Sequence, residues 1–121
     1  MKVIVRITKN FRSEVKPLLK RYQSLPQDLL GLEKELIQNP KLGTELGKNV
    51  YKIRLRIKSK GKGKSGGARV LTLLENTVVA EVEYSEKEIV VNLLSIFDKS
   101  DTENISDSEL KHLIQLFHSS K

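Results

Sequence analysis

The chain has 121 residues, 22 of them lysine or arginine against 15 aspartate or glutamate, and a formal charge of +7 without any cysteine. This length suits a single domain over residues 1–121, and the lack of cysteine excludes disulfides and thiolate metal sites. No apolar run approaches the roughly 20 residues of a membrane-spanning helix, and the N-terminus lacks a signal-peptide pattern. The composition therefore predicts a cytoplasmic protein with no membrane partner.

The first part of the chain predicts a strand followed by two helices. Apolar residues alternate with others over residues 2–8, which is typical of a strand. Apolar residues at helical spacing predict a helix over 10–23, where Pro17 removes a backbone hydrogen bond and should cause a kink or a late start. The segment SLPQ at 24–27 has the pattern of a capping box for a second helix, which the Asn-Pro pair at 39–40 should end.

The second part is expected to be rich in strands, after a loop over residues 42–49. The expected strands cover 50–58, 67–74, 77–84 and 88–97, with a turn at 84–87. Residues 67–84 equally suit one long bent strand, because the pair Glu-Asn at 75–76 is a weak breaker. The strand at 88–97 is nearly continuously apolar, which predicts a central position in a sheet. The segment SDSE at 106–109 has the pattern of a second capping box and should open a C-terminal helix.

This order of elements predicts an α+β fold class. When residues 67–84 count as one strand, the order is strand, two helices, three strands and a helix. Such an order favours an N-terminal strand and a helical hairpin packed on a mainly antiparallel sheet, followed by a C-terminal helix.

The positive charge of the chain is concentrated between residues 52 and 69. This segment holds eight basic residues and no acidic one, whereas the rest of the chain has 14 basic and 15 acidic residues. Its first half alternates cations with apolar residues, which predicts a strand with one face in the core and a row of cations on the other. Regularly spaced cations suit a polyanion, and nucleic acid is the first choice. The eight residues are Lys52, Arg54, Arg56, Lys58, Lys60, Lys62, Lys64 and Arg69.

A solvated, lysine-rich hairpin connection is the simpler interpretation of this segment. Arg69 argues against it, because its neighbours are expected to pair with the 50–58 strand and to bring it beside Lys52 and Arg54. A guanidinium next to two strand-borne cations forms a pocket for phosphate and can bind two of its oxygens. The G-x-G-x-x-G match at 61–66 precedes a strand-like segment, where a dinucleotide site requires a helix.

Other catalytic chemistries lack the residues that they need. His112 and His118 are six positions apart on the expected C-terminal helix, which does not suit paired metal ligands, so neither metal nor cofactor is predicted. The carboxylates, including the cluster at 98–109, fit solvated faces and helix N-terminal charge. Any chemistry must use basic residues and hydroxyls, for which Tyr51 and Tyr84 are optional candidates.

Three segments resemble the RelE/HigB superfamily of bacterial type II toxins. They are NVYKIRL at 49–55, GKSGGARV at 63–70, and FDKS at 97–100 with ENI at 103–105. The KSGGARV run is the most specific and is similar to a HigB-like branch. Because the helical hairpin, the sheet and the final helix also match, the resemblance spans nearly the whole chain and implies a RelE-like fold.

The resemblance implies the toxin component of a type II toxin–antitoxin system, a ribosome-dependent endoribonuclease (mRNA interferase) that cuts mRNA without a metal. The ribose 2′-OH attacks the adjacent phosphate, which gives a 2′,3′-cyclic phosphate and a free 5′-OH. The protein then mainly positions the RNA and stabilises charge on the phosphorane. The implied partners are mRNA, the A site of the 30S ribosomal subunit and a cognate antitoxin that holds the toxin inactive.

By position, the resemblance implies four catalytic residues. Lys52 and Arg54 match the strand-borne basic pair, and Lys52 takes the proton-transfer role because a guanidinium stays protonated. Arg54 is left to stabilise charge. Arg69 matches the arginine that grips the scissile phosphate, and Lys99 would protonate or stabilise the leaving 5′-oxygen. The residues expected to bind ribosomal RNA backbone are Arg56, Lys58, Lys60, Lys62 and Lys64.

The late catalytic tyrosine of RelE aligns with Ile105, which has no proton to give. An RNA- or ribosome-binding module that has lost cleavage is therefore an alternative. A third hypothesis is a role in protein interaction alone, in which the cationic strand seats an acidic segment of a partner.

Overall fold

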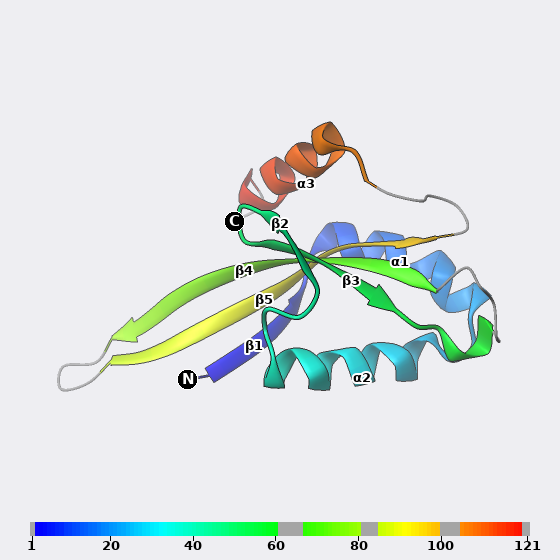
Figure 1. The fold of residues 1–121 in the computed structure, drawn as a ribbon, viewed down its shortest axis with the longest axis horizontal. Helices are drawn as coiled ribbons and strands as arrows, with labels where there is room; N and C mark the ends of the chain where they lie inside the picture. The colour runs from blue at the N-terminus through cyan, green and yellow to red at the C-terminus, as the bar shows by residue number, and fades with distance from the viewer. Residues whose placement is uncertain (1, 61–66, 81–84, 100–104, 120–121) are drawn as a thin grey trace.

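The structure, a computed structural model, describes residues 2–60, 67–80, 85–99 and 105–119. Five strands form one sheet in the order β1-β5-β4-β3-β2, with three α-helices around it (Figure 1). Among the described strands only the β1–β5 pair is parallel, so the predicted α+β class with a mainly antiparallel sheet is confirmed. The strands are β1 (Lys2–Ile7), β2 (Thr44–Gly47), β3 (Val50–Leu55), β4 (Ala68–Ala80) and β5 (Ser85–Asp98). The helices are α1 (Lys9–Arg21), α2 (Leu25–Gln38) and α3 (Asp107–Ser119).

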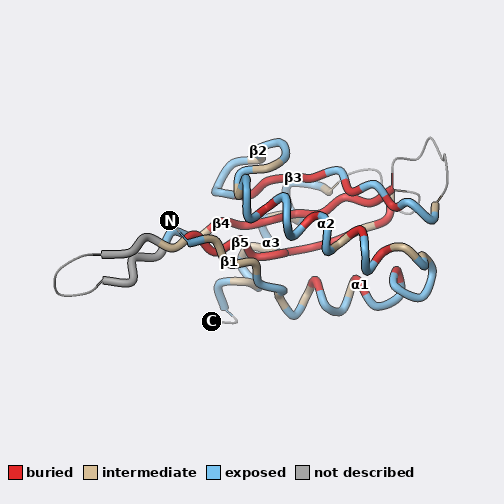
Figure 2. Tube along the Cα trace, turned by 90° about the horizontal axis from the view of Figure 1, so that it is seen from below, coloured by how far each residue is buried: buried red, intermediate tan, exposed pale blue. Residues whose placement is uncertain are grey.

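The helices cover the two faces of the sheet unequally. α1 and α2 bury their apolar sides on one face, where Phe11, Leu25 and Leu36 join the larger core. On the other face α3 packs against a smaller core around Leu71 and Leu94. Figure 2 shows that buried positions are concentrated in the strands and on the inner sides of α1 and α2. The helical hairpin therefore supports the sheet from the face opposite to α3.

The strand boundaries predicted for the long hairpin formed by β4 and β5 differ from those in the structure. β4 runs without a break from Ala68 to Ala80, so the alternative of one long strand is correct and the separate strands at 67–74 and 77–84 are wrong. β5 begins at Ser85, so the predicted turn at 84–87 does not form over its last three residues, while Tyr84 lies outside the described residues. The interior position predicted for the apolar strand is confirmed, since β5 lies between β1 and β4.

One extra residue in β5 changes which side chains face which helices. Leu71 pairs with Ser95 but the next residue, Thr72, pairs with Leu93, so Leu94 forms a bulge. After the bulge the alternation of faces is reversed: Leu93 and Ile96 both join the larger core, whereas Leu94 belongs to the smaller one.

α1 holds this bulge through side chains. Glu14 Oε1 accepts hydrogen bonds from Ser95 Oγ at 2.7 Å and from the backbone N–H of Ile96 at 3.3 Å. Asn10 Nδ2 donates to the carbonyl of Leu94 at 3.0 Å. Polar groups that the bulge removes from the regular ladder are thus satisfied by the first helix.

The capping predictions have mixed outcomes. At α3 the box is confirmed: Ser106 Oγ accepts from the N–H of Glu109 at 3.2 Å, and the Glu109 carboxylate accepts from the N–H of Ser106 at 3.3 Å. At α2 it is wrong, because the Ser24 hydroxyl donates to Asp28 Oδ2 at 2.7 Å instead of capping the helix. α1 begins at Lys9 and runs through Pro17, so the expected late start is also wrong.

The segment around β2 and β3 also differs from the predicted boundaries. The expected loop at 42–49 contains β2, which returns to β3 through Lys48 and Asn49, both with positive φ (53° and 65°). Two consecutive left-handed residues are typical of the tight turns that join antiparallel strands. β3 ends at Leu55 rather than at residue 58, and a 3₁₀ turn follows at Lys58–Lys60.

Candidate nucleic-acid interface

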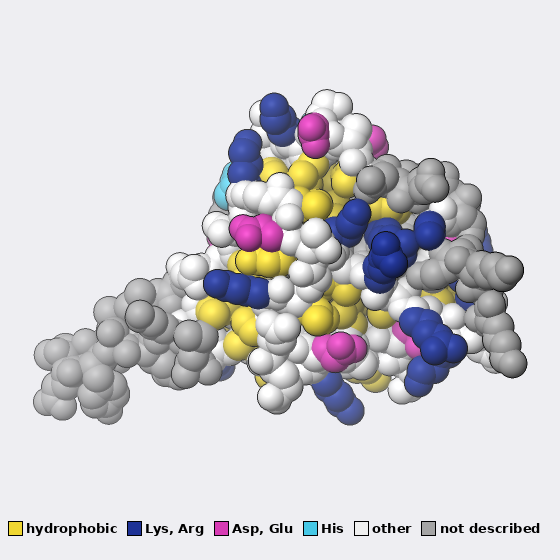
Figure 3. Space-filling model, viewed as in Figure 1, with side chains coloured by type: hydrophobic (Ala, Val, Ile, Leu, Met, Phe, Trp, Pro, Cys, Tyr) yellow, Lys and Arg dark blue, Asp and Glu magenta, His cyan; other side chains and the backbone are white. Residues whose placement is uncertain are grey.

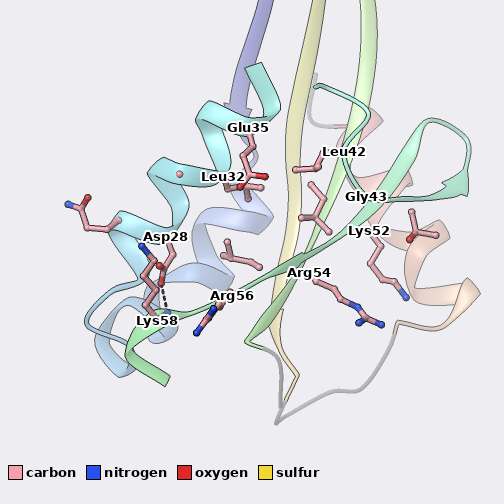
Figure 4. Close-up of a pocket in the computed structure, with 14 residues that line it drawn as sticks. Asp28, Leu32, Glu35, Leu42, Gly43, Lys52, Arg54, Arg56 and Lys58 are labelled. Atoms are coloured by element: carbon pink, nitrogen blue, oxygen red, sulfur yellow. Dashed lines mark hydrogen bonds between the residues drawn. The ribbon is translucent and has the colours of Figure 1, made fainter. Parts of the chain in front are cut away.

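The cation row predicted on the 50–58 strand forms on β3. Tyr51, Ile53 and Leu55 enter the core shared with α1 and α2, whereas Lys52 is half-buried and Arg54 is exposed. Figure 4 shows Lys52 and Arg54 directed away from α2, on the other face of the strand. The period of two therefore divides β3 into a core face and a cationic face, as the sequence indicated.

Arg69 lies beneath this row. β3 and β4 are in a register that sets Arg54 directly opposite Arg69. Arg69 is only 5% exposed, and its Nη1 donates to the carbonyl of Ala68 at 3.3 Å. Burial, and secondly the neighbouring charge of Arg54, lowers the pKa of Arg69 below its usual value. The sequence thus placed Arg69 beside Arg54 correctly but did not indicate that it is buried.

This lowered pKa has a consequence for stability. A base whose pKa is lowered by folding destabilises the folded state at every pH below that pKa, so the effect is constant around neutral pH. We expect Arg69→Met to change the free energy of unfolding by no more than about 1 kcal/mol, because the loss of a buried cation repelled by Arg54 is opposed by the loss of its hydrogen bond to Ala68. Urea unfolding at pH 6 and pH 8 measures this. A clear loss of stability would show that Arg69 holds the fold together.

The other predicted cations lie at different places. Arg56 and Lys58 are exposed just after β3, and Lys99 follows β5, with its backbone N–H donating to the carbonyl of Gly67 at 3.3 Å. In Figure 3 lysine and arginine side chains gather over the region of β3. Lys62 and Lys64 lie outside the described residues.

Lys60 does not belong to the surface row. Its side chain is 11% exposed, and its ammonium forms a salt bridge with Asp98 Oδ1 at 2.7 Å and donates to the carbonyl of Gly67 at 3.2 Å. These contacts join the two described ends of the segment that carries Lys62 and Lys64. The charge of Lys60 is therefore neutralised inside the protein.

Asp98 is the centre of a buried ionic cluster that sequence reasoning missed. Its side chain is fully buried; Oδ2 forms a salt bridge with Arg21 Nη1 at 3.0 Å and accepts a hydrogen bond from the Tyr22 hydroxyl. The cations of Arg21 and Lys60 lie 5.8 and 5.4 Å from the centre of the Tyr22 ring. The solvated role expected for the carboxylate of Asp98 is wrong, because α1, the 3₁₀ turn and β5 converge on it.

The remaining residues offer little further chemistry. Ile105, which the resemblance aligns with a tyrosine of RelE, is half-buried and packs against the core under α3. His112 and His118 are exposed on α3, and Tyr51 is buried on the core face of β3. Over the described residues no group of three metal-ligating side chains comes together.

A groove of about 610 Å³ runs along the outer edge of β3. α2 forms one wall, with Asp28, Leu32 and Glu35, and the backbone of β3 forms the other (Figure 4). At one end the backbone N–H of Lys58 donates to Asp28 Oδ2 at 3.2 Å, which ties the start of α2 to the end of β3. The groove and the cationic face therefore share one strand edge.

The described helices include none that is both long enough and apolar enough to cross a membrane. A scan against protein-family models gives no match, and no curated protein matches the chain. The feature of the molecule that bears most on function is therefore the geometry of β3 and β4, where cations on one strand lie over a buried arginine on the next.

Proposed function

We propose that the protein is the toxin component of a type II toxin–antitoxin system, with a RelE-like fold, and that it cleaves mRNA on the ribosome as a metal-independent endoribonuclease. The observation that supports this most is the pairing of Arg54 on β3 with Arg69 on β4, with Lys52 two residues earlier. Three cations fixed on two paired strands favour a phosphate ligand, and nothing in such a set requires a metal.

The proposed reaction uses a nucleophile from the substrate. The ribose 2′-oxygen bonds to the adjacent phosphorus while the bond from phosphorus to the 5′-oxygen breaks, and the proton leaves the 2′-oxygen as another reaches the 5′-oxygen. Lys52 is assigned the proton transfer, with its neutral amine accepting the proton from the 2′-oxygen, and Arg54 stabilises negative charge on the phosphorane. Lys99 protonates the leaving 5′-oxygen or stabilises its negative charge. Arg69 adds positive potential from beneath Arg54. An anion bound above Arg69 would offset the unfavourable burial of its charge.

Arg56 and Lys58 extend the proposed contact along the RNA backbone, together with Lys62 and Lys64 from the sequence. Lys60 is left out of this set because its ammonium is bound to Asp98. In this proposal a cognate antitoxin, the ribosome and mRNA are the partners of the protein.

A binding module without cleavage is the second candidate. It is favoured by Ile105, whose side chain packs in an apolar core and supplies no proton, and by the burial of Arg69. Such a protein would bind RNA or the ribosome through the same cations without cutting the message.

The two candidates differ in a cell-free translation assay. The 5′ ends of a defined message are mapped by primer extension, with translating ribosomes present or with initiation blocked. New ends that need translating ribosomes, together with a terminal 2′,3′-cyclic phosphate on the upstream fragment, are the expected result. Intact message at protein concentrations that saturate RNA binding would favour the binding module.

RNA affinity should fall steeply with salt if the cationic face binds phosphates. Contacts from the five described cations alone give a log–log slope of about −3.5 for single-stranded RNA by counterion release, and contacts from Lys62 and Lys64 would make it steeper. Fluorescence anisotropy with a labelled RNA at several potassium chloride concentrations measures this slope. A slope near zero would contradict nucleic acid as the target of Lys52, Arg54, Arg56, Lys58 and Lys99.

A further inference from the structure

The groove between α2 and β3 has an apolar floor and polar walls. Leu32 of α2, Leu42 before β2 and Leu55 of β3 supply the apolar surface. Gln27 and Glu35, both exposed, line the groove from α2, and Glu35 lies on the side of the helix that faces β3 (Figure 4). The volume of about 610 Å³ is in the range of small-molecule sites. A flat ring with polar edges suits this combination better than an aliphatic chain or a bare phosphate.

The charges along the groove favour a ligand that is both an anion and a hydrogen-bond donor. Its lining has two acids and four cations, and the cations are Lys52, Arg54, Arg56 and Lys58. One acid, Asp28, is 8% exposed, and its Oδ2 accepts from the Ser24 hydroxyl at 2.7 Å and from the N–H of Lys58 at 3.2 Å. The other acid, Glu35, is exposed and therefore faces any ligand. The excess of cations attracts phosphate, whereas the Glu35 carboxylate requires N–H or O–H donors from the ligand.

The backbone of β3 adds a donor on the opposite wall. The pairing of β2 with β3 reaches only to Lys52, whose carbonyl points to the outer edge, since a Cβ added to Gly43 would clash with it. The carbonyl of Leu55 points the other way, toward β4, since a Cβ added to Gly67 would clash with that oxygen. Backbone polar groups alternate in direction along a strand, so the N–H and C=O of Arg54 face the groove. An uncovered strand edge of this kind offers its polar groups to a ligand.

Guanine is the RNA base that meets these requirements best. Its N1–H and 2-amino group lie side by side and can donate to the two oxygens of one carboxylate, and its O6 is an acceptor for the N–H of Arg54. Adenine and cytosine each present one amino group beside a ring nitrogen that is an acceptor. Uracil presents a single N–H between two carbonyl oxygens, which a carboxylate repels. Pairing of a base with Glu35 therefore favours guanine and disfavours uracil.

We propose that the groove between α2 and β3 binds a guanine base of the RNA, and that Glu35 selects this base by accepting from its N1–H and 2-amino group. The base rests on Leu32 and Leu55, and the phosphates beside it lie at Arg56 and Lys58, which are exposed just after β3. The inference rests on the proposed function in one respect, that RNA is the ligand, and it does not depend on cleavage.

Short labelled RNAs test this selection by fluorescence anisotropy without ribosomes. The probe is an oligouridylate with a single guanosine, and it is compared with the all-uridine RNA of the same length. We expect the native chain to bind the guanosine RNA about tenfold more tightly, the effect of one bidentate contact to a base. An RNA with inosine in place of the guanosine lacks the 2-amino group and should lose most of this preference.

Glu35→Gln removes the carboxylate with little change of shape, and Glu33→Gln is its matched control. Glu33 is exposed on the same helix but lies outside the groove. In Glu35→Gln the preference for guanosine should fall below about threefold, because an amide has one acceptor oxygen where the carboxylate has two. In Glu33→Gln, which has the same change of charge, the preference should stay at about tenfold.

A second pair of variants tests the location of the base. Gly31 lines the groove, and a Cβ added there has no heavy atom within 4 Å, so Gly31→Trp should place a ring where the base would lie. Leu30→Trp puts the same side chain outside the groove, at a position that is 50% exposed. We expect only Gly31→Trp to lose the guanosine preference, with little change in affinity for the all-uridine RNA. Circular dichroism checks that both variants are folded.

The outcomes separate this inference from the proposed nuclease. Equal affinity of the native chain for the two RNAs, with a steep salt dependence, would overturn the groove as a base site and leave the proposed function standing. A guanosine preference that survives both Glu35→Gln and Gly31→Trp would place base recognition elsewhere and would also overturn the inference. A preference that depends on Glu35 in a protein that does not cleave mRNA would uphold the groove and contradict the nuclease. Binding of neither RNA would overturn both.

Discussion

Arg54→Ala is expected to lower the rate of ribosome-dependent mRNA cleavage by about 10²- to 10³-fold, the effect of removing one preorganised group that stabilises transition-state charge. Arg54 is the exposed member of the pair with Arg69, and its side chain lies on the cationic face of β3. Its loss should leave the fold intact because it is outside the core. Quantitative primer extension at a fixed codon, with translating ribosomes in excess, measures the rate.

Arg12→Ala is the matched control for this change. Arg12 is also an exposed arginine, but it lies on α1, on the face of the sheet covered by α1 and α2. Equal losses in both variants would mean that net charge matters and position does not. Full cleavage by Arg54→Ala would remove Arg54 from the proposed mechanism, and an RNA-binding assay on both variants separates binding from chemistry.

Asp98→Ala is expected to lower the free energy of unfolding by about 3 to 5 kcal/mol, the usual effect of removing one partner from a buried ion pair. The largest part of this loss should come from Lys60, whose buried charge would lose the carboxylate. Its side chain is 11% exposed and its ammonium lies 2.7 Å from the carboxylate. Arg21, with a side chain 48% exposed, can turn to solvent. Urea unfolding followed by circular dichroism measures the loss.

A second substitution tests the cause. In Asp98→Ala with Lys60→Met the stranded cation is absent, so part of the lost stability should return. Glu33→Ala, on the exposed side of α2, is the control for an acid outside any described cluster and should change stability by less than about 0.5 kcal/mol. If Asp98→Ala unfolds at the same urea concentration as the native chain, the cluster has no stabilising role.

Features encoded by neighbouring residues could be predicted from the sequence. The cationic face of β3 follows from strict alternation, and the cap of α3 formed because Ser106 and Glu109 are three residues apart. The cap of α2 failed although its pattern is equally good. Ser24 is bound instead by Asp28 within the helix and by Ser59 from a distant turn, so tertiary contacts overrode the local signal.

Features that combine distant segments could not be predicted. The cluster around Asp98 joins residues 21, 22, 60 and 98, and no spacing along the chain relates these positions. Lys60 continued the pattern of alternate lysines, but β3 ends at Leu55, so the strand period no longer applies where Lys60 lies. The depth of Arg69 depends on its neighbours on β3 and β5, which the sequence of β4 does not specify.

The bulge at Leu94 acts as a phase shift within β5. Because Leu94 is the additional residue, Phe97 lies on the side of α3, opposite Arg69, while Asp98 turns toward α1. A strand of the same residues without the shift would direct this carboxylate to the face of Arg69, where it would neutralise the positive potential above β4. A single inserted residue, held by Glu14, thereby keeps acid and base on separate sides of one sheet.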